Sequence, residues 1–163
     1  DLHSFPTRRS SDLEIARHPD WHLDIYGSGD NISYQKLADE LCLSSSVTCH
    51  KSVDHVYEKY SESSIYVLSS RYEGFGLVLV EAMGTGLPVV SFACPCGPRD
   101  IIEDGVSGYL VEAGDVRKMA EKICYLIENR EVRESMGQAA IARAGMFSRD
   151  QVMHRWIELF ESL

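Results

Sequence analysis

The sequence contains no long apolar run and no excess of basic residues. A helix that crosses a bilayer needs about 20 consecutive apolar residues, and no stretch of this chain approaches that length. Nor is there a basic start followed by an apolar core, the pattern of a signal peptide. Asp and Glu outnumber Lys and Arg by 25 to 16, giving a formal charge of −9. Without a long apolar run, we expect no membrane-spanning helix. Because nucleic-acid-binding surfaces are basic and this chain is acidic, we expect no nucleic-acid partner.

Patterns for disulfides and metal sites are missing as well. The five cysteines are an odd number scattered through apolar segments, which is typical of reduced thiols in the cytoplasm. The Cys94-Pro95-Cys96 run is too short and too isolated for a zinc site, and His50 and His55 have no third ligand beside them. We therefore expect a cytoplasmic protein without a metal site.

Length and composition favour one folded domain. The chain has 163 residues, 44% of them hydrophobic, which is enough to bury a core. Residues 1–13 show no periodicity, and we leave them unassigned, as disordered or as non-native sequence joined to the rest. Residues 14–163 are predicted to form the domain.

Strand patterns alternate with helical patterns along this domain. Such alternation is typical of a three-layer α/β fold, Rossmann-like, with a parallel sheet between helices. Ser33, Asp115 and Ser148 are the predicted N-caps of three of the helices. The expected strands are residues 21–26, 47–50, 65–68, 89–92 and 109–111, and the expected longer helices are residues 33–43, 56–61, 76–83, 116–129, 131–144 and 151–163.

The most informative stretch runs from residue 65 to residue 90. Its apolar start predicts a buried parallel strand. Gly74 and Gly76 then let the backbone turn and approach a ligand, and a helix continues to Met83. A glycine turn that opens a helix past the carboxyl end of a strand is where α/β proteins bind phosphates, because free N–H groups and the positive end of the helix dipole converge there.

Two carboxylates, Glu73 and Glu81, bracket this helix. Eight helical residues rise about 12 Å, so the pair is predicted to lie on a similar side but far apart. Paired carboxylates of glycosidases lie roughly 5–9.5 Å apart, which argues against hydrolysis by a shared pair. The spacing fits a long ligand held at both ends, with its anionic middle over the helix N-terminus. The alternative is that both glutamates are ordinary charged residues without a binding role. For Glu81 an unpaired charge among its apolar neighbours would be costly.

The run Glu73-Gly74-Phe75-Gly76, followed by Glu81-Ala82-Met83 and by residues 86–90, resembles the donor-binding signature of retaining GT-B glycosyltransferases of family 4. The resemblance covers roughly residues 14–163 and implies a nucleotide-sugar-binding domain, the C-terminal half of a GT-B fold. It implies that Glu73 contacts hydroxyls of the donor sugar, as the catalytic-site glutamate, and that Glu81 contacts the ribose hydroxyls.

The same resemblance implies further contacts with the donor. The backbone of Gly74, Phe75, Gly76 and Leu77 would wrap the sugar and the diphosphate. Val53 and His55 match positions that meet the nucleobase, although Lys51 stands where the family usually has glycine. No metal or other cofactor is implied, because the helix dipole and backbone amides offset the diphosphate charge.

As a family member, the protein would transfer a sugar from a nucleotide diphosphate sugar to a glycan or lipid-linked acceptor, with retention, in glycan or cell-surface polysaccharide synthesis. The full enzyme would be cytoplasmic, with peripheral association at the inner face of the membrane. The family's basic diphosphate ligands should precede Glu14 and are not recognised there, and its acceptor domain is not in this chain. We therefore expect weak nucleotide binding without turnover. Two alternatives stay open: a GT-B nucleotide-sugar epimerase and a non-catalytic nucleotide-sugar-binding module.

Overall fold

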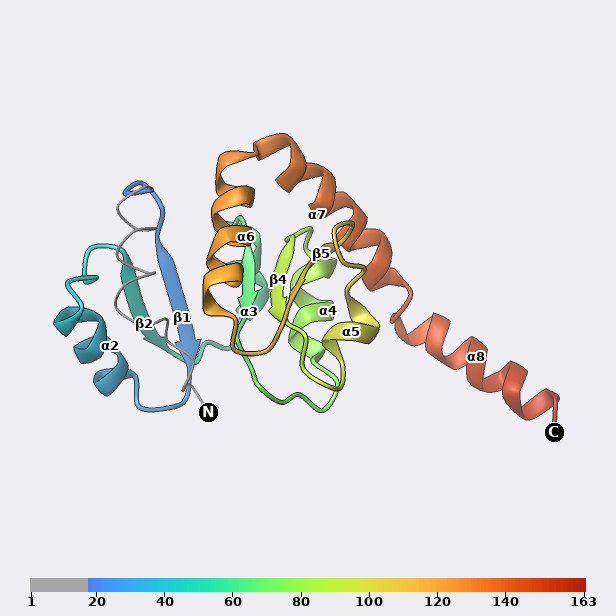
Figure 1. Ribbon diagram of the computed structural model, residues 1–163. Coiled ribbons are helices and arrows are strands. Elements are labelled where there is room, and N and C mark those ends of the chain that lie inside the picture. The colour runs from blue at the N-terminus through green and yellow to red at the C-terminus, as the bar shows by residue number, and fades with distance from the viewer. Residues whose placement is uncertain (1–17) are drawn as a thin grey trace. The chain divides into compact units, whose positions relative to one another are not determined.

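A computed structural model describes residues 18–163, and these residues divide into two units (Figure 1). The described part of the smaller unit ends at Val56, and the larger unit runs from Tyr57 to Leu163. The unassigned residues 1–13 lie outside the described range. That residues 14–163 form a single domain stays a prediction.

The smaller unit is a βαβ arrangement. Strands β1 (Leu23–Gly27) and β2 (Val47–Lys51) pair in parallel, and α2 (Asn31–Glu40) connects them. Parallel strands need such a crossover connection. The buried side chains that hold this unit together are Ala38, Leu43 and Val47, with Ile25 and Leu41 packed against them.

The N-cap predicted for α2 is wrong by three positions. Asp30, not Ser33, caps the helix, and the helix ends at Glu40 rather than at Leu43. The Asp30 carboxylate accepts hydrogen bonds from the backbone N–H of Ser33 at 3.0 Å and from its hydroxyl at 2.6 Å. Both residue types cap helices well. Here the carboxylate accepts both of these hydrogen bonds, so the helix begins at Asn31.

The larger unit contains a three-stranded parallel sheet in the order β3-β4-β5, formed by β3 (Tyr66–Leu68), β4 (Val89–Phe92) and β5 (Gly108–Val111). Every residue of the central strand β4 is buried, as expected of a continuous apolar strand inside a parallel sheet. The helices of this unit are α3 (Val56–Glu62, whose first residue belongs to the smaller unit), α4 (Leu77–Gly84), α5 (Pro98–Ile101), α6 (Val116–Glu128), α7 (Arg130–Gly145) and α8 (Arg149–Glu161).

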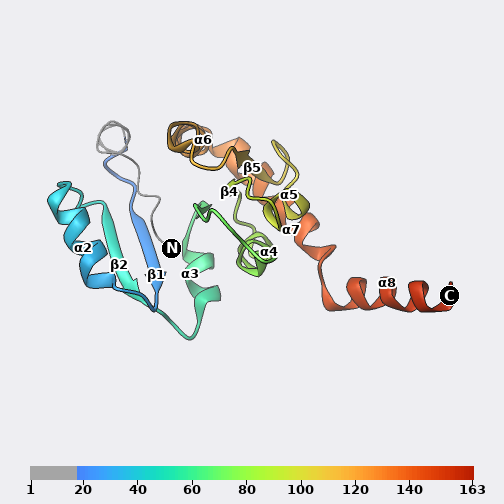
Figure 2. The ribbon, with the colours of Figure 1, turned by 60° about the horizontal axis from the view of Figure 1, so that its bottom comes forward.

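Helices cover both faces of this sheet. Val90 and Phe92 of β4 pack against Met119 and Leu126 of α6. Because side chains alternate along a strand, those of Val89 and Ser91, two positions apart, point to the other face. Helix α4 packs on β3 and β4. Figure 2 shows α6 and α4 on opposite sides of β4. The predicted α/β, Rossmann-like fold with parallel strands is therefore confirmed.

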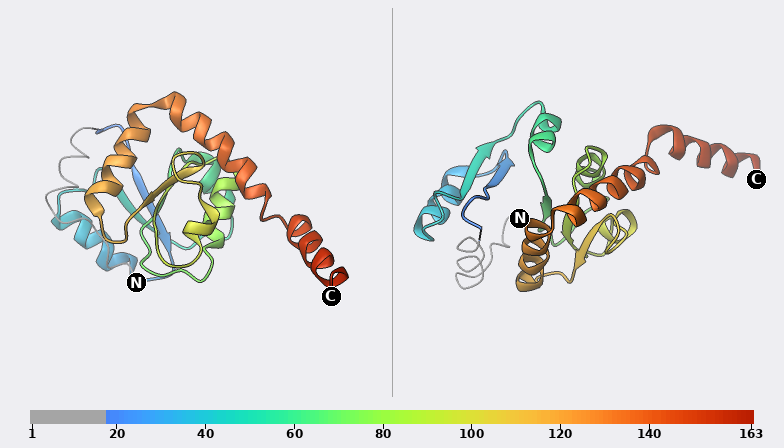
Figure 3. Two further views of the ribbon diagram at one scale, coloured as in Figure 1. Left: turned by 45° about the vertical axis from the view of Figure 1, so that its right-hand side comes forward. Right: turned by 90° about the horizontal axis from the view of Figure 1, so that it is seen from above.

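Helix α8 differs from the other helices because it contains no buried residue. Ser148 caps it, as predicted, by accepting from the N–H of Gln151 at 3.4 Å. Its apolar side chains, including Trp156 at 51% exposure, lie open to solvent. Figure 3 shows α8 extending away from α7. Among residues 18–163, no helix combines the length and apolar character that a membrane crossing requires.

Candidate functional site

The loop after β3 leads into α4 through a glycine in the left-handed region. Gly76 has a φ of 88° and is the N-cap of α4, a conformation that side chains other than glycine rarely adopt. A glycine cap has no side chain to offer, so the first N–H groups of the helix keep their capacity to bind an anion. The glycine turn that opens the helix is as the sequence predicted, and its role in binding a phosphate stays a prediction.

Gly74, unlike Gly76, has no backbone conformation that requires glycine. A Cβ built at Gly74 would meet nothing within 4 Å, and its φ is not in the left-handed region. Its neighbour Phe75 is 41% exposed, and Leu77, the first residue of α4, is 65% exposed. Packing within the chain therefore does not demand glycine at position 74, and the open space around it leaves room for a ligand to approach the backbone.

A second loop, which follows β4, meets the first one. Gly97 precedes α5 with a φ of 84°, and a Cβ at this position would overlap the carbonyl oxygen of Phe75. The N–H of Gly97 donates to the Asp100 carboxylate at 3.4 Å. Since parallel strands end at the same edge, both loops lie at the carboxyl edge of the sheet, where α/β proteins bind ligands. No sequence pattern predicted this contact between the two loops.

Glu73 and Glu81 are both half-buried and both lie near Tyr66. Burial is the main reason that the pKa of Tyr66 is raised, and the charges of Tyr60, Glu73 and Glu81 raise it further. The charge of Glu73 also contributes to the raised pKa of the Cys94 thiol, again after burial. The structure therefore places the two predicted carboxylates within electrostatic reach of one partly buried tyrosine. Strand periodicity alone could not single out Tyr66.

Glu81 borders a hollow of about 490 Å³ between α4 and α7. Tyr57 and Ile141, which are both partly exposed, form part of its apolar lining. A carboxylate beside an apolar hollow can accept hydrogen bonds from ligand hydroxyls that are shielded from water. This is the environment that a ribose-binding role for Glu81 would need.

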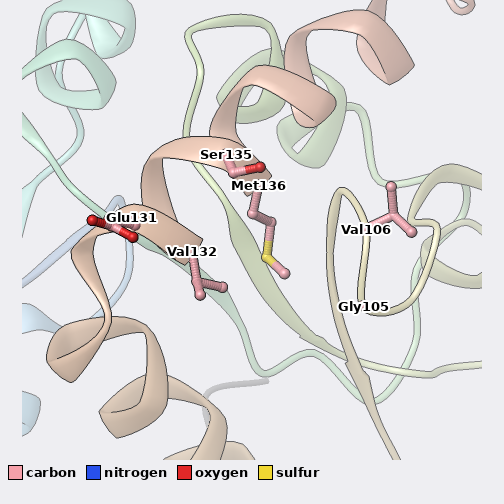
Figure 4. A pocket seen from close by; sticks show the side chains of 6 residues that line it. All are labelled: Gly105, Val106, Glu131, Val132, Ser135 and Met136. Carbon is pink, nitrogen blue, oxygen red and sulfur yellow. The ribbon is translucent and has the colours of Figure 1, made fainter.

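A smaller hollow of about 280 Å³ contains none of the predicted site residues (Figure 4). It lies between the Gly105-Val106 turn, just before β5, and the first turns of α7. Glu131 and Ser135 are its polar side chains, beside Val132 and Met136. Because the turn precedes β5, this hollow lies at the amino edge of the sheet, away from the loops that carry Glu73 and Gly97.

The two predicted nucleobase residues belong to the smaller unit. Val53 and His55 follow β2, and both are exposed, Val53 at 39%. At the end of β1, the Asn31 side-chain amide donates to the carbonyl of Gly27 at 2.9 Å and holds the neighbouring glycine turn. The described residues thus leave both side chains accessible, and their role beside a nucleobase stays a prediction.

Arg99 has partners on two segments of the larger unit. Its Nε donates to the carbonyl of Ala93 at 3.2 Å, and its Nη2 pairs with Glu112 at 3.4 Å. Among residues 18–163, no group of three or more His, Cys, Asp or Glu side chains is arranged to hold a metal ion. The absence of a metal or cofactor from the reaction stays a prediction.

The fold and site define an α/β domain in which a helix N-terminus without a side-chain cap lies between two half-buried glutamates. The sequence pattern of the family described as "Glycosyl transferases group 1" matches residues 9–143. This chain belongs to that family, and its fold is that of GT-B glycosyltransferases.

Known relatives include transferases with different names and are much longer than this chain. An exopolysaccharide phosphotransferase from Streptomyces coelicolor is 35% identical over 151 residues, which are 91% of this chain and 16% of the relative. A poly(ribitol-phosphate) alpha-N-acetylglucosaminyltransferase from Staphylococcus aureus is 32% identical over 85% of this chain and 28% of its own length. This chain therefore spans less than a third of the length of either relative.

A solved structure confirms the fold. A mutant of S. aureus TarM, in complex with fondaparinux, alpha-GlcNAc-glycerol and UDP, superimposes with a TM-score of 0.85 at 29% identity. The match covers 96% of this chain and 33% of TarM.

Proposed function

We propose that this chain is the donor-binding part of a retaining glycosyltransferase that transfers a hexose-type sugar from a nucleotide diphosphate sugar to a glycan or lipid-linked acceptor. The observation that carries the proposal is the uncapped N-terminus of α4 at Gly76, flanked by Glu73 and Glu81. The relatives named as an exopolysaccharide phosphotransferase and a poly(ribitol-phosphate) alpha-N-acetylglucosaminyltransferase support a role in glycan or cell-surface polysaccharide synthesis.

In this proposal each end of the site holds one part of the donor. The N–H groups at the start of α4 receive the diphosphate, and the helix dipole stabilises the negative charge that grows on it as the sugar departs. Glu73 accepts hydrogen bonds from hydroxyls of the sugar, and Glu81 accepts them from the ribose. Charge-assisted hydrogen bonds of this kind fix orientation as well as affinity. The protein would need no metal for this step.

The nucleotide that we propose is uridine diphosphate, on the strength of its presence in the TarM complex. Isothermal titration of the chain with uridine, guanosine and adenosine diphosphates tests the proposal. We expect binding of the uridine nucleotide, and Glu81→Ala should weaken it by about 1.5–3 kcal/mol, the range for hydrogen bonds to a charged group. Glu131→Ala is the matched control, because this helix glutamate borders the hollow at the opposite edge.

Unchanged uridine diphosphate affinity in Glu81→Ala, or an equal loss in Glu131→Ala, would contradict the proposed ribose contact. Sugar transfer itself should require further parts of a longer protein, because the family places acceptor binding in another domain and the relatives are at least three times as long as the matched segment. We therefore expect no turnover by the 163-residue chain. Steady glycosyl transfer by this chain would show that expectation to be wrong.

A further inference from the structure

An aromatic contact joins the glutamate-bearing loop to the end of α7. The rings of Phe75 and Phe147 meet edge to face, with their centroids 5.8 Å apart and their planes at 65°. Phe147 lies in the short link between Gly145, the last residue of α7, and Arg149, the first of α8. Phe75 lies two residues after Glu73 and directly before Gly76. The contact therefore bears on the backbone between the carboxylate and the helix N-terminus.

Arg143 ties Phe147 to α5. Its guanidinium carbon lies 5.4 Å from the centroid of the Phe147 ring. Its Nε donates to the carbonyl of Ile101 at 2.7 Å, and its Nη2 donates to the carbonyl of Asp100. These carbonyls belong to the last turn of α5, so the arginine satisfies a helix C-terminus with a positive charge.

The contacts form a closed ring of elements around the loop. From Phe147 they pass through Arg143 to α5, and from Gly97, which precedes α5, back to the carbonyl of Phe75. Tyr72 is 84% exposed, and Gly74 is exposed as well. Each packing contact of a largely exposed loop helps to fix its position. For the loop around Phe75, the Phe147 ring and Gly97 supply two such contacts from different elements.

We propose that Phe147, supported by Arg143, is a positioning residue that holds the loop of residues 69–76 so that Glu73 and the first N–H groups of α4 face one ligand. This inference rests on the proposed donor-binding function. It assigns to the link between α7 and α8 a role in donor-sugar recognition, although the link itself touches no ligand. Aromatic edge-to-face pairs have preferred geometries, so the pair fixes direction as well as distance.

The test compares Phe147→Ala, Phe147→Tyr and a matched control, Tyr125→Ala. Tyr125 is a 43% exposed aromatic residue that makes an edge-to-face pair with Tyr109 at 6.3 Å, away from the loop. Hydrogen–deuterium exchange is followed in the full chain, in peptides that cover residues 69–80 and residues 108–128. Titrations with uridine diphosphate and with a uridine diphosphate sugar measure how much affinity the sugar adds.

We expect Phe147→Ala to speed exchange in residues 69–80 by roughly two- to tenfold, the factor that an aromatic pair supplies, and to reduce the affinity that the sugar adds. Phe147→Tyr keeps the aromatic ring, so this variant should show the wild-type exchange in residues 69–80 and the wild-type affinity that the sugar adds. Tyr125→Ala should act on residues 108–128 alone. The proposal is overturned if exchange in residues 69–80 stays unchanged, if Tyr125→Ala speeds it equally, or if the loop loosens without any loss of the sugar's contribution.

The proposed donor-binding function and the positioning role of Phe147 can fail separately. If the wild-type chain binds no nucleotide, the proposed function loses its support, and the exchange data alone then decide whether Phe147 holds the loop. If the wild-type chain binds the nucleotide and Phe147→Ala leaves exchange in residues 69–80 unchanged, the proposed function stands and the positioning role is wrong.

Discussion

At the scale of single residues, two glycines shape the site for different physical reasons. Gly76 needs its left-handed backbone to open α4, and the nearest side chain, that of Leu79, lies 3.4 Å from a Cβ built there. Gly97 also has a positive φ, but in addition its missing Cβ makes room for the carbonyl of Phe75. One glycine thus sets a backbone direction, and the other lets two loops touch.

Gly97→Ala should therefore be more damaging than a positive φ alone explains. Backbone strain of this kind costs about 1–3 kcal/mol, and the overlap with Phe75 adds to it. Gly105→Ala is the matched control, because Gly105 has a φ of 79° with nothing within 4 Å of a Cβ. Chemical denaturation measures both variants. Equal losses of unfolding free energy would contradict the importance of the contact between the loops.

Glu73→Gln should separate sugar recognition from nucleotide recognition. The amide keeps the size of the side chain but removes the charge that strengthens its hydrogen bonds. We expect uridine diphosphate to bind as before, and the affinity added by the sugar to fall by roughly ten- to hundredfold. Titration with the nucleotide and then with the nucleotide sugar checks this. A loss of nucleotide affinity itself would place Glu73 nearer to the diphosphate than we propose.

At the scale of elements, α4 and α6 are stabilised in different ways. Helix α4 is short and buries Leu79, Ala82 and Met83 against its surroundings, while its N-terminus lacks a side-chain cap. Helix α6 has a conventional start, in which the Asp115 carboxylate accepts from the N–H of Lys118 at 2.9 Å. Packing thus keeps α4 folded and leaves its N-terminal N–H groups for a ligand, which a capped helix could not do as well.

Removing the α6 cap should destabilise the larger unit without touching the site. We expect Asp115→Ala to lower the free energy of unfolding by about 1 kcal/mol, the typical value for an N-cap. Asp150→Ala, in the exposed first turn of α8, is the control and should have a smaller effect. Thermal unfolding measures both variants, and nucleotide affinity should be unchanged in each. An Asp115→Ala protein as stable as the wild type would show that the cap contributes nothing.

At the scale of the whole molecule, titrating groups set limits on stability at both ends of the pH range. The pKa of Asp30 is lowered, first by its hydrogen bond with the Ser33 side chain, and the pKa of Asp39 is lowered, first by that with Ser44. A lowered carboxyl pKa adds stability above the unfolded value, and this is lost as pH falls below about 4. Burial raises the pKa of Tyr66, so the stability that its neutral side chain contributes is lost at alkaline pH instead.

We therefore expect a stability plateau around neutral pH with losses on both sides. Below the unfolded tyrosine pKa of about 10, Tyr66 is neutral in both states. Above it, the unfolded chain ionises first, and folding is penalised. Tyr66→Phe should flatten the alkaline limb and leave the acid limb unchanged, as followed by denaturation at a series of pH values. An alkaline limb of unchanged slope in this variant would show that other groups control it.

Sequence patterns alone predicted most elements of the fold and the central loop of the site. Strands and helices are predicted from the periodicity of their apolar residues. The predicted N-caps of α6 and α8 were correct because Asp115 and Ser148 stand directly before apolar helical repeats. For α2 the choice between Asp30 and Ser33 was wrong, because two good capping residues lie close together and a side-chain hydrogen bond decides between them.

What the sequence by itself determined is the α/β class, the glycine turn at Gly76 and the glutamates on either side of it, because each depends on residues that are neighbours in the chain. Only the tertiary structure decided that Gly97 touches Phe75, that Phe147 packs on the same residue and that Tyr66 lies near both carboxylates. These contacts join residues far apart in the chain. Their geometry depends on where the parallel strands end and on which loops thereby meet at the carboxyl edge of the sheet.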